Sequence, residues 1–118
     1  MKKKTNNTVN YIQLAERTYP ELTREFKLIQ KEDYELFCKK QADYGLSNIS
    51  LGSDLSSLED KHVSQCSIIF RISDKVQRLL NLVVKKNSSS ANEPVEDNFA
   101  DITNYGTIAR IVRNGKWK

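Results

Sequence analysis

The chain has 118 residues and a formal net charge of +4, and 38% of its residues are hydrophobic. This length predicts one domain with a modest core. Much of the excess positive charge lies at residues 2–4 and at Lys116 and Lys118, so the rest is almost neutral. The composition argues against specific duplex nucleic acid as a partner, because such partners need a dense basic face. A small anionic ligand remains compatible with it.

The cysteines and the apolar runs indicate the compartment. Cys38 and Cys66 lack the spacing of a disulfide framework or a zinc site, so we expect two buried free thiols. No apolar run is long enough to span a membrane, and the basic start lacks the apolar core of a secretion signal. These features predict a cytoplasmic protein without a membrane partner.

The first half of the chain predicts two helices after a disordered basic tail at residues 1–7. Apolar residues at spacings of four and three predict a helix over 20–30. The charged residues 31–33 are expected to break it and to cap a second helix over 34–44, which Gly45 ends.

The second half predicts two longer helices. Residues 46–59 are rich in Ser, Gly, Asn and Asp and are expected to form a loop. A helix over 60–84 follows, and a flexible connector over 85–92 leads to a helix over 94–112 that Asn114-Gly115 ends. The apolar face expected on the first of these helices is Ile69, Ile72, Val76, Leu79, Leu80 and Val83.

These elements predict an all-α fold, a four-helix bundle-like single domain over 8–114 with a short tail at 115–118. Helices of this size leave apolar surface uncovered in a small domain. We therefore expect a homo-oligomer, a dimer or a larger assembly, in which ligand sites between subunits are natural.

Acidic residues form a stripe on the last predicted helix. Asp97 and Asp101 lie one turn apart, so both carboxylates can converge on a hard cation such as Mg²⁺, and Glu96 can contribute as a base or further ligand. The alternative is complementarity to the helix dipole, worth roughly 0.3–1 kcal/mol for each acid in the first turn. That alternative explains Glu96 and Asp97 better than Asp101 and Asn104, which lie further along.

Basic residues form a second stripe, on the helix over 60–84. Arg71, Lys75 and Arg78 are candidates to contact phosphate, and Asp74 is a candidate to hold a metal or orient an arginine. The alternative is a solvated face with ion pairs one turn apart.

A third candidate segment, residues 39–50, surrounds the expected helix end at Gly45. Tyr44 is suited to stack on a base, Asn48 to read a base or ribose, and Lys40 to approach phosphate. A simple glycine cap followed by a turn is the alternative reading.

Three segments, KKQADYGLSN, FRISDKVQRLLNLV and EPVEDNFADITNYGTIA, resemble in this order the phage-enriched helical family called the nucleotide-modification-associated domain, first family. The likeness covers about residues 34–112. It implies a nucleotide-related role and, for a phage-encoded chain, the cytoplasm of an infected bacterial host. The ligand-binding candidates are Lys40, Asp43, Tyr44, Asn48, Arg71, Lys75, Arg78, Asn81, Asn104 and Tyr105.

A more distant similarity is to the MazG-like all-α NTP pyrophosphohydrolases, which bind Mg²⁺ through acidic pairs on bundle helices. Asp97-x-x-x-Asp101 followed by Asn104-Tyr105 looks like their last acidic helix. This resemblance implies Asp97 and Asp101 as metal ligands and Glu96 and Asp74 as catalytic candidates. The paired E-x-x-E of their earlier helix has no clear counterpart, although Glu32 and Glu35 have that spacing.

Three functions therefore compete. The first is Mg²⁺-dependent hydrolysis of a nucleotide phosphoanhydride. The second is a non-catalytic sponge that sequesters a nucleotide, including a cyclic or ADP-ribose-derived immune signal, to counter host defence. The third is an interaction protein whose polar stripes are only surface.

Overall fold

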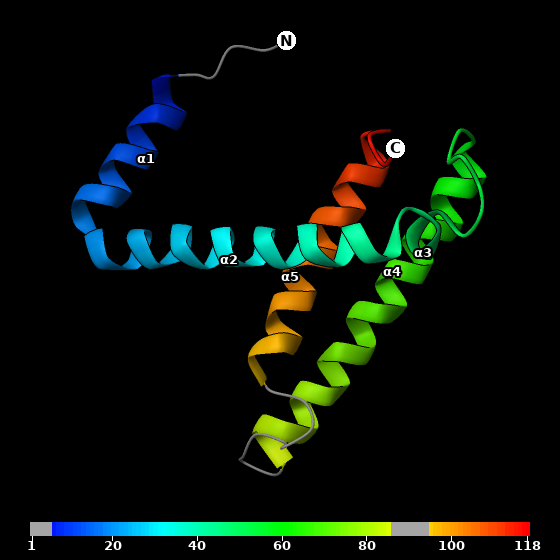
Figure 1. Ribbon diagram of the computed structural model, residues 1–118. Coiled ribbons are helices and arrows are strands. Elements are labelled where there is room, and N and C mark those ends of the chain that lie inside the picture. Colours follow the sequence, from blue (N-terminus) through cyan, green and yellow to red (C-terminus); the bar gives the residue numbers. More distant parts are fainter. Residues whose placement is uncertain (1–5, 86–94) are drawn as a thin grey trace. The chain divides into compact units, whose positions relative to one another are not determined.

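The computed structural model describes residues 6–85 and 95–118, which are helical with connecting turns and contain no strand. The helices are α1 (Asn6–Thr18), α2 (Pro20–Tyr44), α3 (Ser47–Ser50), α4 (Leu58–Leu79), the π-helix η1 (Leu80–Lys85) and α5 (Val95–Arg113) (Figure 1). The all-α prediction is confirmed. The chain forms two compact units, residues 1–35 and residues 36–118, which we call the first and second units.

Helix α2 is continuous where a break was expected at residues 31–33, so that prediction is wrong. The segment between Pro20 and Tyr44 contains no glycine and no further proline, and its lysines, glutamates and leucines favour a helix interior. The expected end is confirmed. Gly45 has the left-handed φ of 70° that a glycine adopts without strain, and its N–H donates to the Gln41 carbonyl at 3.0 Å.

The segment over 46–59, expected to be a loop, contains the short helix α3 and supplies part of the core. Ile49 and Leu55 are buried, and Leu51 and Leu55 both have a positive φ. A left-handed conformation is unfavourable for leucine by roughly 1–2 kcal/mol. Burial of Ile49 and Leu55 offsets this cost. A prediction based on the polar composition of the segment does not take the burial of these two side chains into account.

Helix α4 begins two residues before the expected start, because the Ser57 hydroxyl caps it by accepting from the Asp60 N–H at 3.0 Å. It ends in the π-helix η1, and the connector expected at 85–92 lies outside the described residues except for Lys85. The expected apolar face is partly wrong. Ile68 and Leu82, which were not expected on this face, are buried. Four residues of the expected face are exposed, namely Ile69, Val76, Leu80 and Val83.

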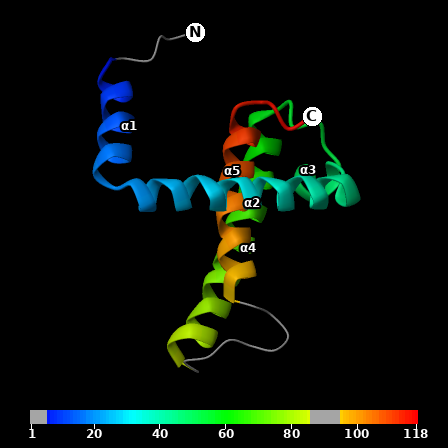
Figure 2. The same cartoon turned by 60° about the vertical axis from the view of Figure 1, so that its left-hand side comes forward.

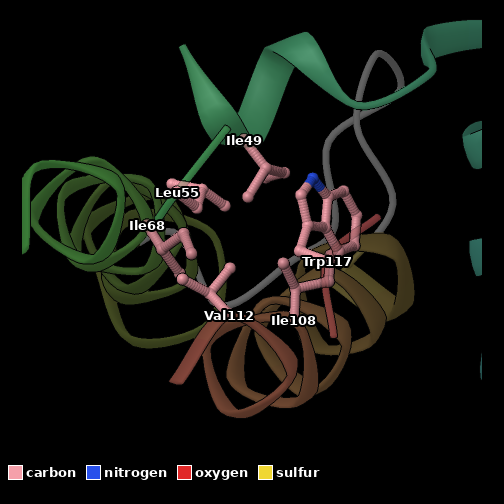
Figure 3. Close-up of a cluster of buried hydrophobic side chains, with 6 residues drawn as sticks. All are labelled: Ile49, Leu55, Ile68, Ile108, Val112 and Trp117. Carbon is pink, nitrogen blue, oxygen red and sulfur yellow. The ribbon is translucent and has the colours of Figure 1, made fainter. Parts of the chain in front are cut away.

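Helices α4 and α5 pack against each other, and α3 packs against α4 (Figure 2). The core of the second unit is formed by Ile49, Leu55, Ile68, Ile108, Val112 and Trp117 (Figure 3). Cys38 and Cys66 are exposed, so the expectation of buried thiols is wrong.

Trp117 belongs to the core, although the sequence placed it in a C-terminal tail. After α5, the Lys116 N–H donates to the Ile111 carbonyl and the Gly115 N–H to the Val112 carbonyl, which is the bonding pattern of a Schellman turn. This turn directs the chain back over the helix. Trp117 is 7% exposed, and its Nε1 donates to the Leu46 carbonyl at 3.1 Å.

The disordered tail was expected over residues 1–7. Residues 1–5 lie outside the described part of the chain, and Asn6 and Asn7 belong to α1. Among the described helices, none is both long enough and apolar enough to cross a membrane.

Candidate functional site: a hollow beside Asp101

A hollow in the second unit lies where the C-terminal end of α2, the short α3 and the middle of α5 meet. Its cavity volume is about 40 Å³, so it is a shallow hollow that is partly open to solvent. Enclosed small-molecule sites have volumes of roughly 300–1,000 Å³, so a ligand held here would stay partly in solvent. The lining residues are Phe37, Lys40, Gln41, Tyr44, Asn48, Ile49, Asp101, Asn104, Tyr105, Ile108 and Trp117.

The carboxylate of Asp101 binds two lysines at the edge of this hollow. Lys40 Nζ on α2 lies 2.8 Å from Oδ1, and Lys75 Nζ on α4 lies 3.0 Å from Oδ2. The Asp101 and Lys75 side chains are only 13% and 16% exposed. Asp101 therefore joins three helices through one carboxylate, and the cluster keeps one net positive charge.

The pKa values of this cluster follow from burial and charge. Burial opposes the charge of Asp101, but hydrogen bonds from Lys40 and Lys75 outweigh it and hold its pKa below the ordinary 3.8. Burial also opposes the charge of Lys40, but Asp101 raises the Lys40 pKa above 10.5. Both groups are therefore charged at neutral pH.

Arg71 on α4 lies behind the hollow and positions two of its walls. Its Nη2 donates to the Asn48 carbonyl at 2.6 Å, and its guanidinium lies 5.8 Å from the centre of the Tyr105 ring. A cation over an aromatic face adds about 0.5–1 kcal/mol. Arg71 thus ties α3 and α5 to α4 in this structure and does not line the hollow.

Asn48 carries a polar atom that matters for binding. Its side-chain oxygen is buried and accepts no hydrogen bond within the described residues. An unsatisfied buried acceptor costs about 1–3 kcal/mol, and Asn48 lines the hollow. The amide can also rotate to present its nitrogen. A ligand with hydrogen-bonding groups would satisfy it.

The structure brings about half of the predicted site residues together. The hollow includes Lys40, Tyr44, Asn48, Asp101, Asn104 and Tyr105. Lys75 and Arg71 do not line it but bind the lining residues Asp101 and Asn48. The exposed residues outside its lining are Asp43, Asp74, Arg78, Asn81, Glu96 and Asp97. Arg78 Nη2 lies 3.2 Å from Asp74 Oδ2, one turn apart on α4. This pair matches the alternative interpretation of the basic stripe as a solvated face with ion pairs.

Sequence reasoning missed five lining residues: Phe37, Gln41, Ile49, Ile108 and Trp117. Gln41 could have been identified from the sequence, because it lies one turn before Gly45. In the structure its Nε2 donates to the Gly45 carbonyl. Trp117 carried none, because its place depends on the turn after α5.

The predicted Mg²⁺ site does not fit this arrangement. Both carboxylate oxygens of Asp101 already carry lysine ammonium groups, which take the positions a cation would need. Asp97 is exposed in the first turn of α5. Within residues 6–85 and 95–118, no group of three or more acidic, histidine or cysteine side chains is placed to hold a metal.

Acid should weaken the second unit through Asp101. Its pKa is lowered in the folded chain, so its contribution to stability is present above about pH 4, the ordinary value, and is lost as pH falls through the folded pKa. We expect Asp101→Asn to melt well below wild type at pH 7 and the gap to close towards pH 2. Thermal melts across this range test it, and a gap that stays constant would contradict the ion-pair interpretation.

The helices and this hollow define a small all-α domain with a shallow, partly cationic and partly aromatic hollow. A comparison with protein families matches residues 40–112 to Nucleotide modification associated domain 1. The chain belongs to this family, which confirms the resemblance, and the domain is associated with nucleotide modification. Searches of curated proteins and of solved structures find no match.

Proposed function

We propose that the second unit binds a nucleotide in the hollow beside Asp101 and holds it without hydrolysis. The observation that carries this proposal is the placement of Lys40, Tyr44 and Asn48 around one hollow, with Lys40 positioned by Asp101. An ammonium group suits a phosphate. Tyr44 is 61% exposed, so a base can stack on its ring, which is worth roughly 1–3 kcal/mol.

The state of Asp101 favours binding over hydrolysis. Metal-assisted hydrolysis needs carboxylates that are available to a cation, and here the carboxylate holds two lysines. The proposal thus corresponds to a protein that sequesters a nucleotide. A cyclic or ADP-ribose-derived signal that a host uses against phage is one such ligand.

A panel of linear and cyclic nucleotides, each with Mg²⁺ and with a chelator, tests this function. Thermal shift reports binding, and chromatography of the denatured mixture reports whether the ligand is intact. We expect a shift that the chelator does not remove and recovery of intact ligand. Metal-dependent conversion to a monophosphate would contradict the proposal and support the hydrolase.

Lys40→Gln should weaken binding of the nucleotide found in this way by about ten- to a hundredfold, because a charge-assisted hydrogen bond contributes about 1.5–3 kcal/mol. Lys39→Gln is the matched control, since Lys39 precedes Lys40, is exposed and lies outside the hollow. Titration calorimetry measures both. Equal losses for the two variants would mean that Lys40 acts only through the net charge of the chain.

A further inference from the structure

Another hollow of the second unit lies where the N-terminal end of α4 meets the C-terminal end of α5 (Figure 2). Its cavity volume is about 250 Å³, which is larger than that of the hollow beside Asp101. One water molecule takes up about 30 Å³ in the liquid, so an anion of several heavy atoms fits here. The lining residues are Leu58, Lys61, His62, Gln65, Arg113 and Asn114.

The lining of this hollow carries only basic and neutral side chains. Gln65 lies four residues after Lys61 and three after His62, so these three side chains share one face of α4. The two acidic residues in the first turn of α4 do not line the hollow. Arg113 comes from the last turn of α5. Two helices therefore bring positive charge to the same space.

Contacts between the two helices set the positions of the cationic groups. Arg113 Nη1 donates to Gln65 Oε1 at 3.3 Å, so the guanidinium is held between α5 and α4. Lys61 Nζ lies beside Gly115 in the turn after α5, because a Cβ atom added to Gly115 would stand 4.0 Å from it. Within the described part of the chain, neither Lys61 nor Arg113 forms an ion pair with a carboxylate. The two cations therefore have no counter-charge in this part of the chain.

The helix dipole of α5 accounts for these cations only in part. Cationic side chains often lie at the C-terminal end of a helix, because its last carbonyls lack partners. Here the carbonyls of residues 110–112 already accept hydrogen bonds from the backbone N–H groups of residues 114–116. The hollow also lies at the N-terminal end of α4, where the helix dipole favours anions. An anion would therefore lower the free energy of this arrangement.

We propose that the hollow at Lys61 and Arg113 binds a phosphate group, either as inorganic phosphate or as the terminal phosphate of a small molecule. The planar fork of Arg113 can donate two parallel hydrogen bonds to phosphate oxygens, and Lys61 adds a point charge. His62 and Asn114 add N–H donors to the lining. The hollow shares no lining residue with the hollow beside Asp101, so this proposal does not depend on nucleotide binding there.

Phosphorus NMR of inorganic phosphate titrated with the full chain tests this proposal, at low ionic strength because salt screens exposed charges. Lys61→Gln and Arg113→Gln should each raise the dissociation constant about tenfold or more, the loss expected for one charge-assisted hydrogen bond. Arg110→Gln is the matched control. Arg110 is exposed on the same helix and lies outside the lining, so this variant should bind phosphate within about twofold of wild type.

Circular dichroism shows whether each variant keeps its helices. The titration is repeated in Lys40→Gln with inorganic phosphate and with a nucleoside monophosphate, and the tighter of the two identifies the free or the esterified phosphate as the ligand. Loss of phosphate binding in Lys40→Gln, with binding retained in Lys61→Gln and Arg113→Gln, would overturn this proposal and leave the proposed function intact. A wild type that does not bind phosphate, or an equal loss in Arg110→Gln, would overturn it as well.

Discussion

Trp117→Ala is expected to lower the free energy of unfolding of the second unit by about 3–5 kcal/mol, the range for removing a buried large aromatic side chain. Trp117 is buried against the core residues Ile49 and Ile108, and its ring meets Phe37 edge-on with centroids 6.3 Å apart. The variant also removes the indole donor to the Leu46 carbonyl, which keeps its bonds from the Ile49 and Ser50 N–H groups. Chemical denaturation followed by far-UV circular dichroism measures the loss.

Trp117→Phe separates packing from hydrogen bonding. It keeps an aromatic ring near Phe37 and removes only the Nε1 donor and part of the volume, so we expect a loss of about 1–2 kcal/mol. Lys116→Ala is the control, because Lys116 is exposed and its backbone bond to Ile111 is retained. If Trp117→Ala were as stable as this control, Trp117 would not belong to the core in solution.

Asp101→Asn is expected to cost about 3 kcal/mol of stability at pH 7, because it removes the negative charge that two ammonium groups contact in a largely buried place. Asp97→Asn removes the same charge one turn earlier, at an exposed position, and should change stability by less than about 0.5 kcal/mol. Equilibrium unfolding of both variants gives the comparison. Equal and small effects would show that Asp101 does not anchor the lysines.

A double-mutant cycle isolates the pair between Asp101 and Lys75. Replacing both by apolar residues, as in Asp101→Leu with Lys75→Met, removes both charges of the pair, whereas each single change removes only one of them. We therefore expect the double variant to lose clearly less stability than the sum of the two single variants. Strict additivity would mean that the two side chains do not interact.

The sequence predicted the helical class and most helix ends, because glycines and caps act locally. Gly45 and Gly115 both end helices where expected. The break at residues 31–33 was wrong because charged residues fit a helix interior as well as a cap. The core face of α4 was partly wrong because apolar residues surround much of the helix, and only the packing partner selects Ile68 over Ile69.

Several residues of the candidate site could be predicted from the sequence, but the contacts between them could not. Tyr44, Asn48 and Asp101 were identified by residue type, and the structure brings them to one hollow. The pairing of Asp101 with Lys40 depends on how α2 and α5 pack across 61 residues of sequence. No local pattern contains that information, so the contacts of Asp101 with two lysines could not be predicted from the sequence.

The ion pairs that Asp101 forms with Lys40 and Lys75 also affect the entropy of ligand binding. A lysine side chain loses up to roughly 1.5–2 kcal/mol of rotamer freedom when it is fixed in place. In this chain Lys40 and Lys75 are already restrained by folding. A phosphate of the proposed nucleotide would therefore meet a Lys40 ammonium group that is already preorganised. Calorimetry of nucleotide binding should then show a smaller entropic penalty than a mobile surface lysine would impose.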